Sequence, residues 1–89
     1  MIFITLVKSK GKPTKEATAG GSKLFAKVAE ECGVKFLGIY WTLGRYDGVS
    51  IAEALDEKSY MKAILRFGDM GSTETLVAVK REDALKLLE

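Results

Sequence analysis

The chain has 89 residues, with 14 Lys and Arg against 12 Asp and Glu, a single cysteine, and no histidine, asparagine or glutamine. The absence of histidine excludes histidine-based catalysis and histidine zinc sites, and the lone Cys32 can form neither an intramolecular disulfide nor a cysteine cluster for a metal. A chain of this length makes one domain, residues 1–89. Because such domains bury only about 60–65% of the unfolded surface, we expect a partner subunit to complete the core.

The charges and the lack of a targeting or membrane-spanning segment predict a cytoplasmic protein with no membrane partner, and they disfavour a nucleic-acid partner. The net charge is +2, far from the strongly basic composition of a nucleic-acid binder. The apolar run at residues 2–7 is too short for a signal-peptide core or a membrane span. We interpret the one cationic cluster as part of a solvated loop; it consists of Lys8, Lys10, Lys12 and Lys15. The missing amides are thermolabile side chains, and their absence indicates a thermophilic source.

The first third of the chain predicts a strand and a helix. Residues 2–7 are apolar and mostly β-branched, which is typical of a strand. Residues 8–21 have no regular hydrophobic period. The sequence leaves open whether this segment covers a cavity as a lid. The glycine pair at 20–21 is expected to break any helix before it, so we place the helix start at Ser22, a good N-cap. Gly33 ends this helix. Its apolar stripe consists of Leu24, Phe25, Val28, Ala29 and Cys32.

A hairpin follows the first helix. Residues 34–43 are rich in aromatic and β-branched side chains, and residues 46–54 alternate in the same manner, so both segments are predicted strands. Gly44 and Arg45 lie between them and predict a tight turn.

The second half repeats the first in outline. Asp56 caps a helix that Gly68 and Gly71 end. Residues 73–79 form a fourth strand, and residues 81–88 form a short C-terminal helix. The order predicts an α+β fold: a ferredoxin-like split βαβ sandwich (βαββαβ plus a short C-terminal helix) with two helices on one face of a four-stranded antiparallel sheet.

The first two strands are apolar on both sides. In the first strand the two alternating sets are Ile2, Ile4 and Leu6 against Phe3, Thr5 and Val7. In the second strand they are Leu37, Ile39 and Trp41 against Phe36, Gly38 and Tyr40. Two helices cover only one face of such a sheet, and a large exposed apolar face usually marks an interaction surface. We therefore predict a homo-oligomer, a dimer or a multiple of dimers, in which the open faces meet across a two-fold axis.

Four segments resemble the GYD-domain family over residues 22–79. They are Tyr40-Trp41-Thr42-Leu43-Gly44, Gly44-Arg45-Tyr46-Asp47, Glu53-Ala54 and Thr73-Glu74-Thr75-Leu76. Arg45 separates Gly44 from Tyr46-Asp47, so the namesake tripeptide is interrupted here. The resemblance implies a ferredoxin-like domain related to the dimeric α+β barrels. It implies no reaction and no catalytic residues, because the family is uncharacterised.

Candidate site residues come from the hairpin and the fourth strand. The candidate ligand-binding residues are Tyr40, Trp41, Tyr46, Thr73 and Thr75. Tyr40 and Trp41 would stack on a planar ligand or line its pocket, and the alternative is packing in the core or at an interface.

Two carboxylates are candidate catalytic groups. Asp47 would act as a general base or anchor a cation, and the alternative is that it caps backbone amides of the hairpin. Glu74 would become an acid or base if it faced the barrel interior, where burial would raise its pKa. The alternative for Glu74 is a salt bridge to Arg45 or Arg66.

Three functions remain open at this point. The first is a domain that binds a small apolar or aromatic molecule in a cavity between paired sheets. The second is a cofactor-free enzyme, monooxygenase-like or isomerase-like, in which carboxylates and a tyrosine transfer protons; it rests on analogy of fold. The third is an RNA-binding module, which the near-neutral charge and the third strand, with Gly48, Val49, Ser50 and Ile51 in place of stacking aromatics, make the weakest. None of them calls for a cofactor or a metal.

Overall fold

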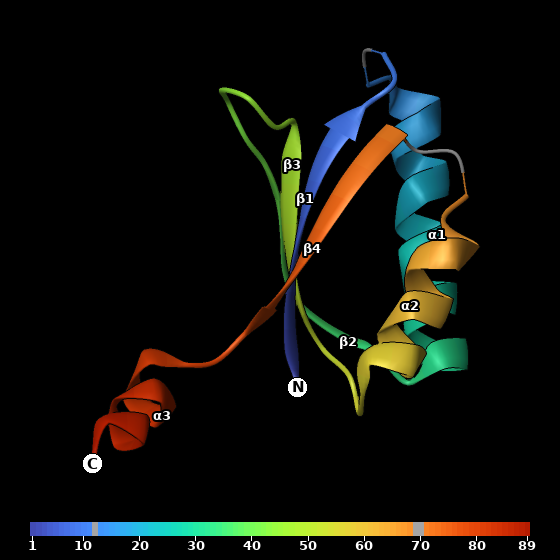
Figure 1. The fold of residues 1–89 in the computed structure, drawn as a ribbon. Helices are drawn as coiled ribbons and strands as arrows, with labels where there is room; N and C mark the ends of the chain where they lie inside the picture. Colours follow the sequence, from blue (N-terminus) through green and yellow to red (C-terminus); the bar gives the residue numbers. More distant parts are fainter. Residues whose placement is uncertain (12, 69–70) are drawn as a thin grey trace.

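The computed structural model describes residues 1–11, 13–68 and 71–89, so Lys12 of the cationic cluster lies outside the described residues. In chain order the elements are β1 (Ile2–Ser9), α1 (Lys15–Cys32), β2 (Lys35–Trp41), β3 (Gly48–Glu53), α2 (Glu57–Arg66), β4 (Gly71–Ala78), α3 (Arg81–Leu85) and the 3-10 turn η1 (Lys86–Leu88). The strands form one antiparallel sheet in the order β2-β3-β1-β4, and α1 and α2 lie on the same side of it (Figure 1). The predicted α+β class, split βαβ order and four-stranded antiparallel sheet are confirmed.

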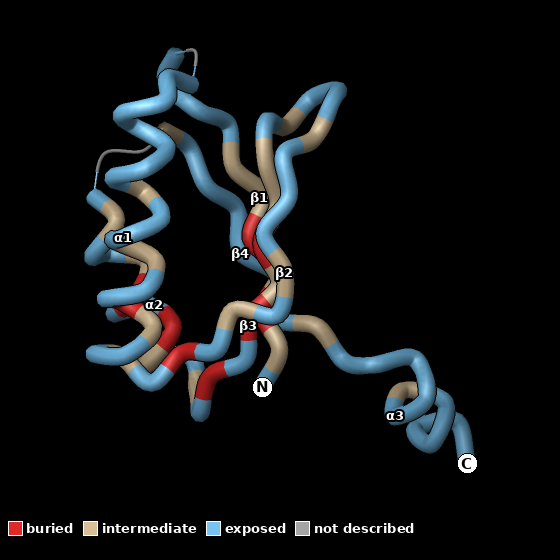
Figure 2. Tube along the Cα trace, turned by 180° about the vertical axis from the view of Figure 1, so that it is seen from behind, coloured by how far each residue is buried: buried red, intermediate tan, exposed pale blue. Residues whose placement is uncertain are grey.

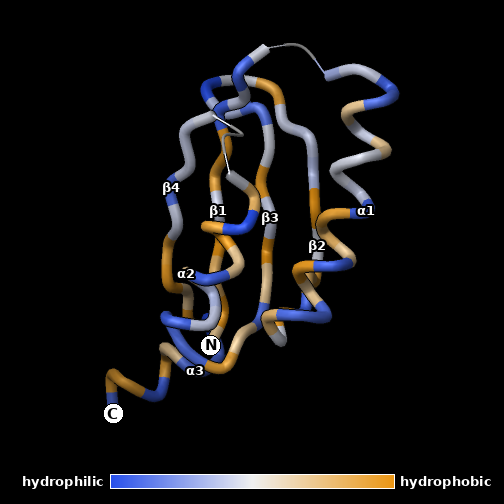
Figure 3. Tube along the Cα trace, turned by 90° about the vertical axis from the view of Figure 1, so that its right-hand side faces the viewer, coloured by the Kyte–Doolittle hydropathy of each residue, from blue (hydrophilic) through white to orange (hydrophobic). Residues whose placement is uncertain are grey.

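The strand register sorts the sheet residues onto two faces. Phe3 and Thr5 are each 2% exposed beneath the helices, and Ser50 in β3 and Thr75 in β4 lie opposite Thr5 on this helix face. The alternate residues point the other way, away from α1 and α2, because successive side chains of a strand point to opposite faces, and we call that side the open face. Its apolar residues are Ile4, Leu6, Val49, Ile51, Leu76 and Tyr40. Both sides of the sheet are therefore substantially apolar, and Figure 3 shows hydrophobic stretches along the strands.

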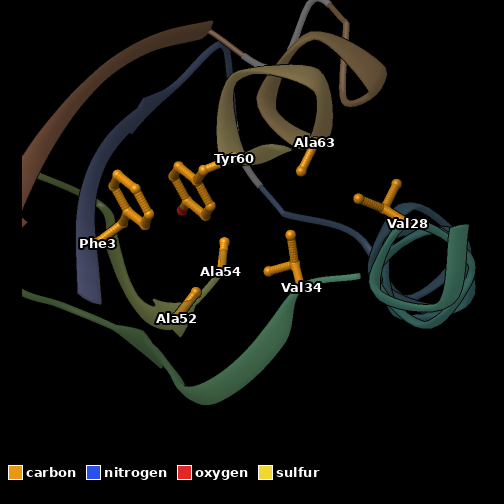
Figure 4. Packing of buried hydrophobic residues seen from close by; sticks show 7 residues of the cluster. All are labelled: Phe3, Val28, Val34, Ala52, Ala54, Tyr60 and Ala63. Atoms are coloured by element: carbon orange, nitrogen blue, oxygen red, sulfur yellow. The ribbon is translucent and has the colours of Figure 1, made fainter. Parts of the chain in front are cut away.

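The buried core lies at the lower end of the molecule as drawn in Figure 1, where β1 begins. It consists of Phe3, Val28, Val34, Ala52, Ala54, Tyr60 and Ala63 (Figure 4). The ring of Tyr60, from α2, stacks on Phe3 with the ring centroids 4.4 Å apart, and Val28 of α1 is fully buried. Toward its upper end α1 becomes exposed (Figure 2), so tight packing is confined to the lower half of the molecule.

The predicted start of the first helix is wrong. Helix α1 begins at Lys15 and runs through the glycine pair at 20–21. Thr14 supplies the N-cap, because its Oγ1 accepts the backbone N–H of Ala17 at 3.1 Å. Ser22 lies inside the helix, and its hydroxyl donates to a backbone carbonyl of the preceding turn. Each interior glycine costs only about 1 kcal/mol relative to alanine, which a capped helix packed on a sheet can absorb.

The predicted helix ends at Gly33, Asp56 and Gly68 hold, whereas Gly71 is the first residue of β4 and the last helix ends at Leu85. Gly33 follows α1 at a φ of 66°, in the left-handed region that favours glycine. Asp56 caps α2, with its Oδ1 accepting the N–H of Ser59 at 2.8 Å. Helix α2 ends at Arg66, and Gly68 follows at a φ of 65°.

The connection between β2 and β3 is longer than the predicted tight turn at Gly44 and Arg45. It spans residues 42–47. Thr42 closes it twice, with its N–H donating to the Asp47 carbonyl at 3.0 Å and its hydroxyl donating to the Tyr46 carbonyl at 2.7 Å. The turn prediction missed this because one backbone and one side-chain hydrogen bond of Thr42 replace regular strand pairing at the tip.

The chain after β4 forms a separate arm. Helix α3 and η1 contain no buried residues and lie on the opposite side of the sheet from α1 and α2 (Figures 1 and 2). The radius of gyration is 14.0 Å, whereas a compact domain of this length has about 12 Å. Among the described residues, the helices are too short or too polar to cross a membrane.

Candidate ligand-binding cleft

A cleft of about 970 Å³ separates the upper half of α1 from the helix face of the sheet. It lies within one chain, between sheet and helices, and not between paired sheets, where the sequence led us to expect a cavity. One face of α1 explains its position, because the residues along that face become smaller toward the upper end. Val28 is buried in the core and Phe25 is half-buried, whereas Gly21 and Ala17 line the cleft without filling it. A Cβ placed on Gly21 would meet nothing within 4 Å.

The sheet side of the cleft also carries a position without a side chain. Val7 of β1 pairs with Gly48 of β3, and Gly48 pairs with Trp41 of β2; all three line the cleft. A Cβ on Gly48 would lie 3.2 Å from the Tyr40 carbonyl oxygen. Glycine at this position therefore leaves open the space between Val7 and Trp41.

Aromatic rings form the wall between the cleft and the core. Phe25 of α1 meets Phe36 of β2 edge to face, with centroids 4.9 Å apart. Phe67, just after α2, lies 4.7 Å from Phe25 and 6.3 Å from Phe36. All three rings line the cleft together with Ile39 and Ile64, so its wall is apolar and suited to a flat ring.

Hydroxyl groups form the floor. The Tyr60 hydroxyl lies 2.6 Å from Thr5 Oγ1, and Thr5 Oγ1 lies 3.1 Å from Thr75 Oγ1. Ser50, opposite Thr5 in the register, is 7% exposed and lines the cleft beside Tyr60 and Thr5. Each hydroxyl is both a donor and an acceptor, so the floor can present either to a bound polar atom.

Trp41 lies at the rim of the cleft. Its side chain is 70% exposed, and it also lines a second hollow of about 410 Å³ against the first turns of α1. Tyr40 is also among the residues around the cleft, but its ring lies on the open face, against Gly38, where a Cβ would come within 2.7 Å of Tyr40 Cε2. A tryptophan at such an opening would report on a ligand that enters.

The two motif segments of the hairpin and β4 meet on the sheet, outside the cleft. The Tyr46 hydroxyl donates to Glu74 Oε2 at 3.1 Å. Glu74 is exposed and pairs with Leu6, which places it on the open face. The guanidinium of Arg45 lies 5.8 Å from the centre of the Tyr46 ring. The salt bridge that we considered between Glu74 and Arg66 is replaced by an ion pair of Arg66 with Glu31.

Asp47 accepts a backbone amide, as its alternative role proposed, but the amide belongs to β1 and not to the hairpin. Its Oδ2 accepts the backbone N–H of Ser9 at 2.7 Å, and its own N–H donates to the Val7 carbonyl at 2.8 Å. These bonds tie the hairpin to the end of β1 instead of capping amides within the hairpin itself. Asp47 also lines the cleft.

The remaining predicted site residues, Thr73 and Thr75, both lie on the helix face of β4. Thr75 touches the floor of the cleft through Thr5, and Thr73 is exposed on the helix face at the sheet edge. Sequence reasoning missed Tyr60, Thr5 and the phenylalanine wall. The one available signal was Thr5, a polar residue that alternates with Phe3 and Val7 in an otherwise apolar strand.

The shifted pKa values lie outside the cleft. A hydrogen bond from Arg66 lowers the pKa of Glu31, and the same bond raises the pKa of Arg66. The hydrogen bond from the Ser59 backbone amide lowers the pKa of Asp56. Within residues 1–11, 13–68 and 71–89, no three cysteine or acidic side chains gather as metal ligands would. The chemistry that the cleft offers is hydrogen bonding and apolar contact.

Comparisons with known proteins agree with this fold. The family model described as GYD domain matches residues 1–88. The crystal structure of FFRP-DM1 superposes with a TM-score of 0.60 at 17% identity, covering 88% of this chain and 97% of that one. The crystal structure of TTHA0845 from Thermus thermophilus superposes with a TM-score of 0.53 at 20% identity, covering 89% and 92%. Identities this low show a shared fold alone, and no curated protein matches the chain.

Proposed function

This chain belongs to the GYD-domain family, and we propose that it is a cytoplasmic small-molecule-binding domain that works as a homodimer. Its cleft would take a small, flat, largely apolar or aromatic molecule that carries one hydroxyl or carbonyl group. The observation that supports this most is the cleft of about 970 Å³ between α1 and the sheet. Ligand pockets of roughly 300–1000 Å³ typically combine apolar walls with a few placed polar groups.

The shape of the preferred ligand follows from the wall. Phe25, Phe36 and Phe67 offer ring faces and edges within 4.7–6.3 Å of one another. A flat ring slid between α1 and the sheet would replace water on these surfaces, and apolar burial of this kind contributes about 25 cal/mol per Å². An aliphatic chain would gain the area but not the ring contacts.

The polar group of the ligand follows from the floor. Tyr60 and Thr75 already share the hydroxyl of Thr5, whereas Ser50, opposite Thr5 in the register, lines the cleft. A ligand oxygen placed over Ser50 would hydrogen-bond to its hydroxyl, next to the hydroxyl groups of the cleft floor. Discrimination against a ligand without that oxygen would amount to about 1 kcal/mol, the net value of one neutral hydrogen bond.

The test uses 2-naphthol and naphthalene as probes. We expect 2-naphthol to bind with one site per chain, to shift the backbone amide resonances of Gly21 and Gly48 in ¹H–¹⁵N NMR, and to bind about 5-fold more tightly than naphthalene. Ser50→Ala should remove that preference and leave the naphthalene affinity unchanged. Binding that leaves both glycine amides unshifted, or no binding at 1 mM probe, roughly the weakest affinity of interest, would overturn the proposal.

Binding is favoured over catalysis because the candidate proton-transfer groups do not converge. Asp47 is engaged with a backbone amide at the cleft, and Glu74 is engaged with Tyr46 on the open face. In general acid–base catalysis each such group must be within hydrogen-bond reach of the atom of one bound substrate that it protonates or deprotonates, and groups on opposite faces of the sheet cannot both reach one small substrate. The enzyme alternative therefore rests on fold analogy alone.

The homodimer is supported by the surface that one chain leaves exposed. The chain exposes 6739 Å², whereas a folded monomer of 9.7 kDa exposes about 5100 Å². The excess of roughly 1600 Å² exceeds the roughly 800 Å² that each partner buries in a standard interface. Much of the apolar part lies on the open face, where Leu76 and Tyr40 are 47% and 55% exposed. A monomeric mass by light scattering at micromolar concentration would refute the dimer.

A further inference from the structure

The residues after β4 form an arm, residues 79–89, that has almost nothing to hold it against its own chain. Its hydrogen bonds join Asp83 and Ala84 to Lys80, and Glu89 to Lys86, and its ion pair joins Lys86 to Asp83. All of these interactions stay inside the arm. Among the described helices and strands, α3 packs mainly against η1.

The arm is apolar as well as isolated. Val79 is 59% exposed, and the three leucines are 45% (Leu85), 78% (Leu87) and 83% (Leu88) exposed. Ala84, Leu85 and Leu88 follow helical spacing on one side, and Figure 3 shows hydrophobic segments in the arm. A helix as short as α3 and η1 together is not stable alone in water. Its stability must come from burial of this apolar side against another surface.

The direction of the arm points to a surface of the same protein. Strand β4 ends at Ala78 and α3 starts at Arg81, so only two residues connect them. Lys80 has an extended backbone, with φ −58° and ψ 141°, which carries the arm away from the body. The arm lies on the open-face side of the sheet (Figures 1 and 2), the side on which Leu76 and the other open-face residues lack a cover.

We infer that the arm of each chain docks on the open face of a second copy of this chain, so that two arms are exchanged across the two-fold axis. The inference deepens the proposed homodimer and rests on it. In a symmetric dimer the exchange makes the same contact twice. A substitution at one leucine of the arm therefore changes two identical contacts. The arm and the open face each supply the apolar surface that the other leaves unpaired.

The first experiment measures the dimer dissociation constant by analytical ultracentrifugation on full-length variants. In Leu85→Glu with Leu88→Glu, we expect the constant to rise at least about 100-fold, because charged groups replace apolar burial in both copies of the contact. The matched control is Met61→Glu with Leu65→Glu, a similarly spaced pair on α2 that is 62% and 74% exposed and lies on the other side of the sheet. The control should stay within about 3-fold of the unmodified protein.

The outcomes separate the arm from the dimer. A dimer whose dissociation constant is no more affected by the arm variant than by the control overturns the arm exchange and leaves the proposed dimer standing. A wild-type protein that is monomeric overturns both. Ligand binding in the cleft is measured independently by the naphthol titration and is unaffected by either result.

A second experiment distinguishes exchange from folding back onto the same chain. An equal mixture of ¹⁴N- and ¹⁵N-labelled protein, unfolded and refolded together, is treated with an amine crosslinker. Lys8 and Lys35 lie on the open face by alternation along β1 and β2, so exchange predicts that crosslinks from Lys86 to either of them appear in mixed-isotope pairs as often as in same-isotope pairs. Crosslinks found only between peptides of the same isotope would show that the arm covers its own open face, which contradicts the inference.

Discussion

The width of the cleft depends on Gly21, and a pair of substitutions at adjacent glycines tests this directly. Gly21 lines the cleft, whereas Gly20 is exposed on α1. A Cβ on either would meet nothing within 4 Å, so leucine fits at both positions without displacing backbone. Gly21→Leu places four carbons in the cleft, and Gly20→Leu places the same four carbons in solvent.

The helix propensity change is the same in both variants. Replacing glycine by leucine in a helix interior stabilises by about 0.7 kcal/mol, which corresponds to a rise in Tm of roughly 3–5 °C for a domain of this size. Gly21→Leu should gain more than Gly20→Leu, because its side chain also buries apolar surface near Phe25 and Phe36. The expected additional gain is on the order of 1 kcal/mol if about 40 Å² are buried.

Ligand binding should change in only one of the two variants. Gly21→Leu occupies the volume that 2-naphthol needs, so its affinity should fall at least about 10-fold, which corresponds to 1.4 kcal/mol. Gly20→Leu should keep the affinity of the unmodified protein. Calorimetric titration and scanning calorimetry on the three proteins measure both effects. Equal loss of affinity in both variants, or no loss in either, would refute the assignment of the cleft.

Three further predictions concern the floor, acid stability and the open face. Tyr60→Phe removes the hydroxyl that lies 2.6 Å from Thr5 and should lower the free energy of unfolding by about 1 kcal/mol in urea titrations; an unchanged midpoint would mean that this bond adds nothing. The amide hydrogen bond at the start of α2 lowers the pKa of Asp56. The ionised Asp56 carboxylate therefore contributes fully to the free energy of unfolding above the pKa of the unfolded state, and this contribution is lost as pH falls below about 4. The urea midpoint of the unmodified protein, compared with Asp56→Asn, should therefore decline from that pH downward, and a pH-independent difference would contradict the linkage. Glu74→Gln should change the 2-naphthol affinity by no more than about 2-fold, roughly the usual effect of a surface substitution, because Glu74 is hydrogen-bonded to Tyr46 on the open face. A large loss of affinity would place that carboxylate at the ligand.

The order of the elements could be predicted because each element carries its own period and its own end signal. The alternation in residues 2–7, the left-handed Gly33 and the Asp56 cap are local features, and all three appear in the structure. The start of α1 could not be predicted by the same rules. Local helix propensity predicts a break at the glycine pair 20–21. In the structure, the cap at Thr14 and the packing of the helix on the sheet offset the helix-propensity cost of about 1 kcal/mol per glycine.

The candidate site could be predicted only in part. Trp41 and Tyr40 stood out by residue type; Trp41 lines the cleft, whereas the Tyr40 ring lies on the open face. Thr5 and Tyr60 are separated by 55 positions, and no spacing rule joins a strand residue to a residue on a distant helix. Glu74 also stood out, yet the alternation of β4 left two choices of face, and the pairing of Glu74 with Leu6 decided between them.

The sequence by itself determined the α+β class, the order of strands and helices and the apolar character of both faces of the sheet. It also excluded histidine chemistry. All of these depend on composition and on the hydrophobic period within single elements. The tertiary structure decided where an internal cleft opens and where the C-terminal arm points. Both depend on how α1 and the arm are placed relative to the sheet. That placement is set by packing between residues far apart in the chain: Val28 and Tyr60 bury the lower half, and the small residues of α1 leave the upper half open.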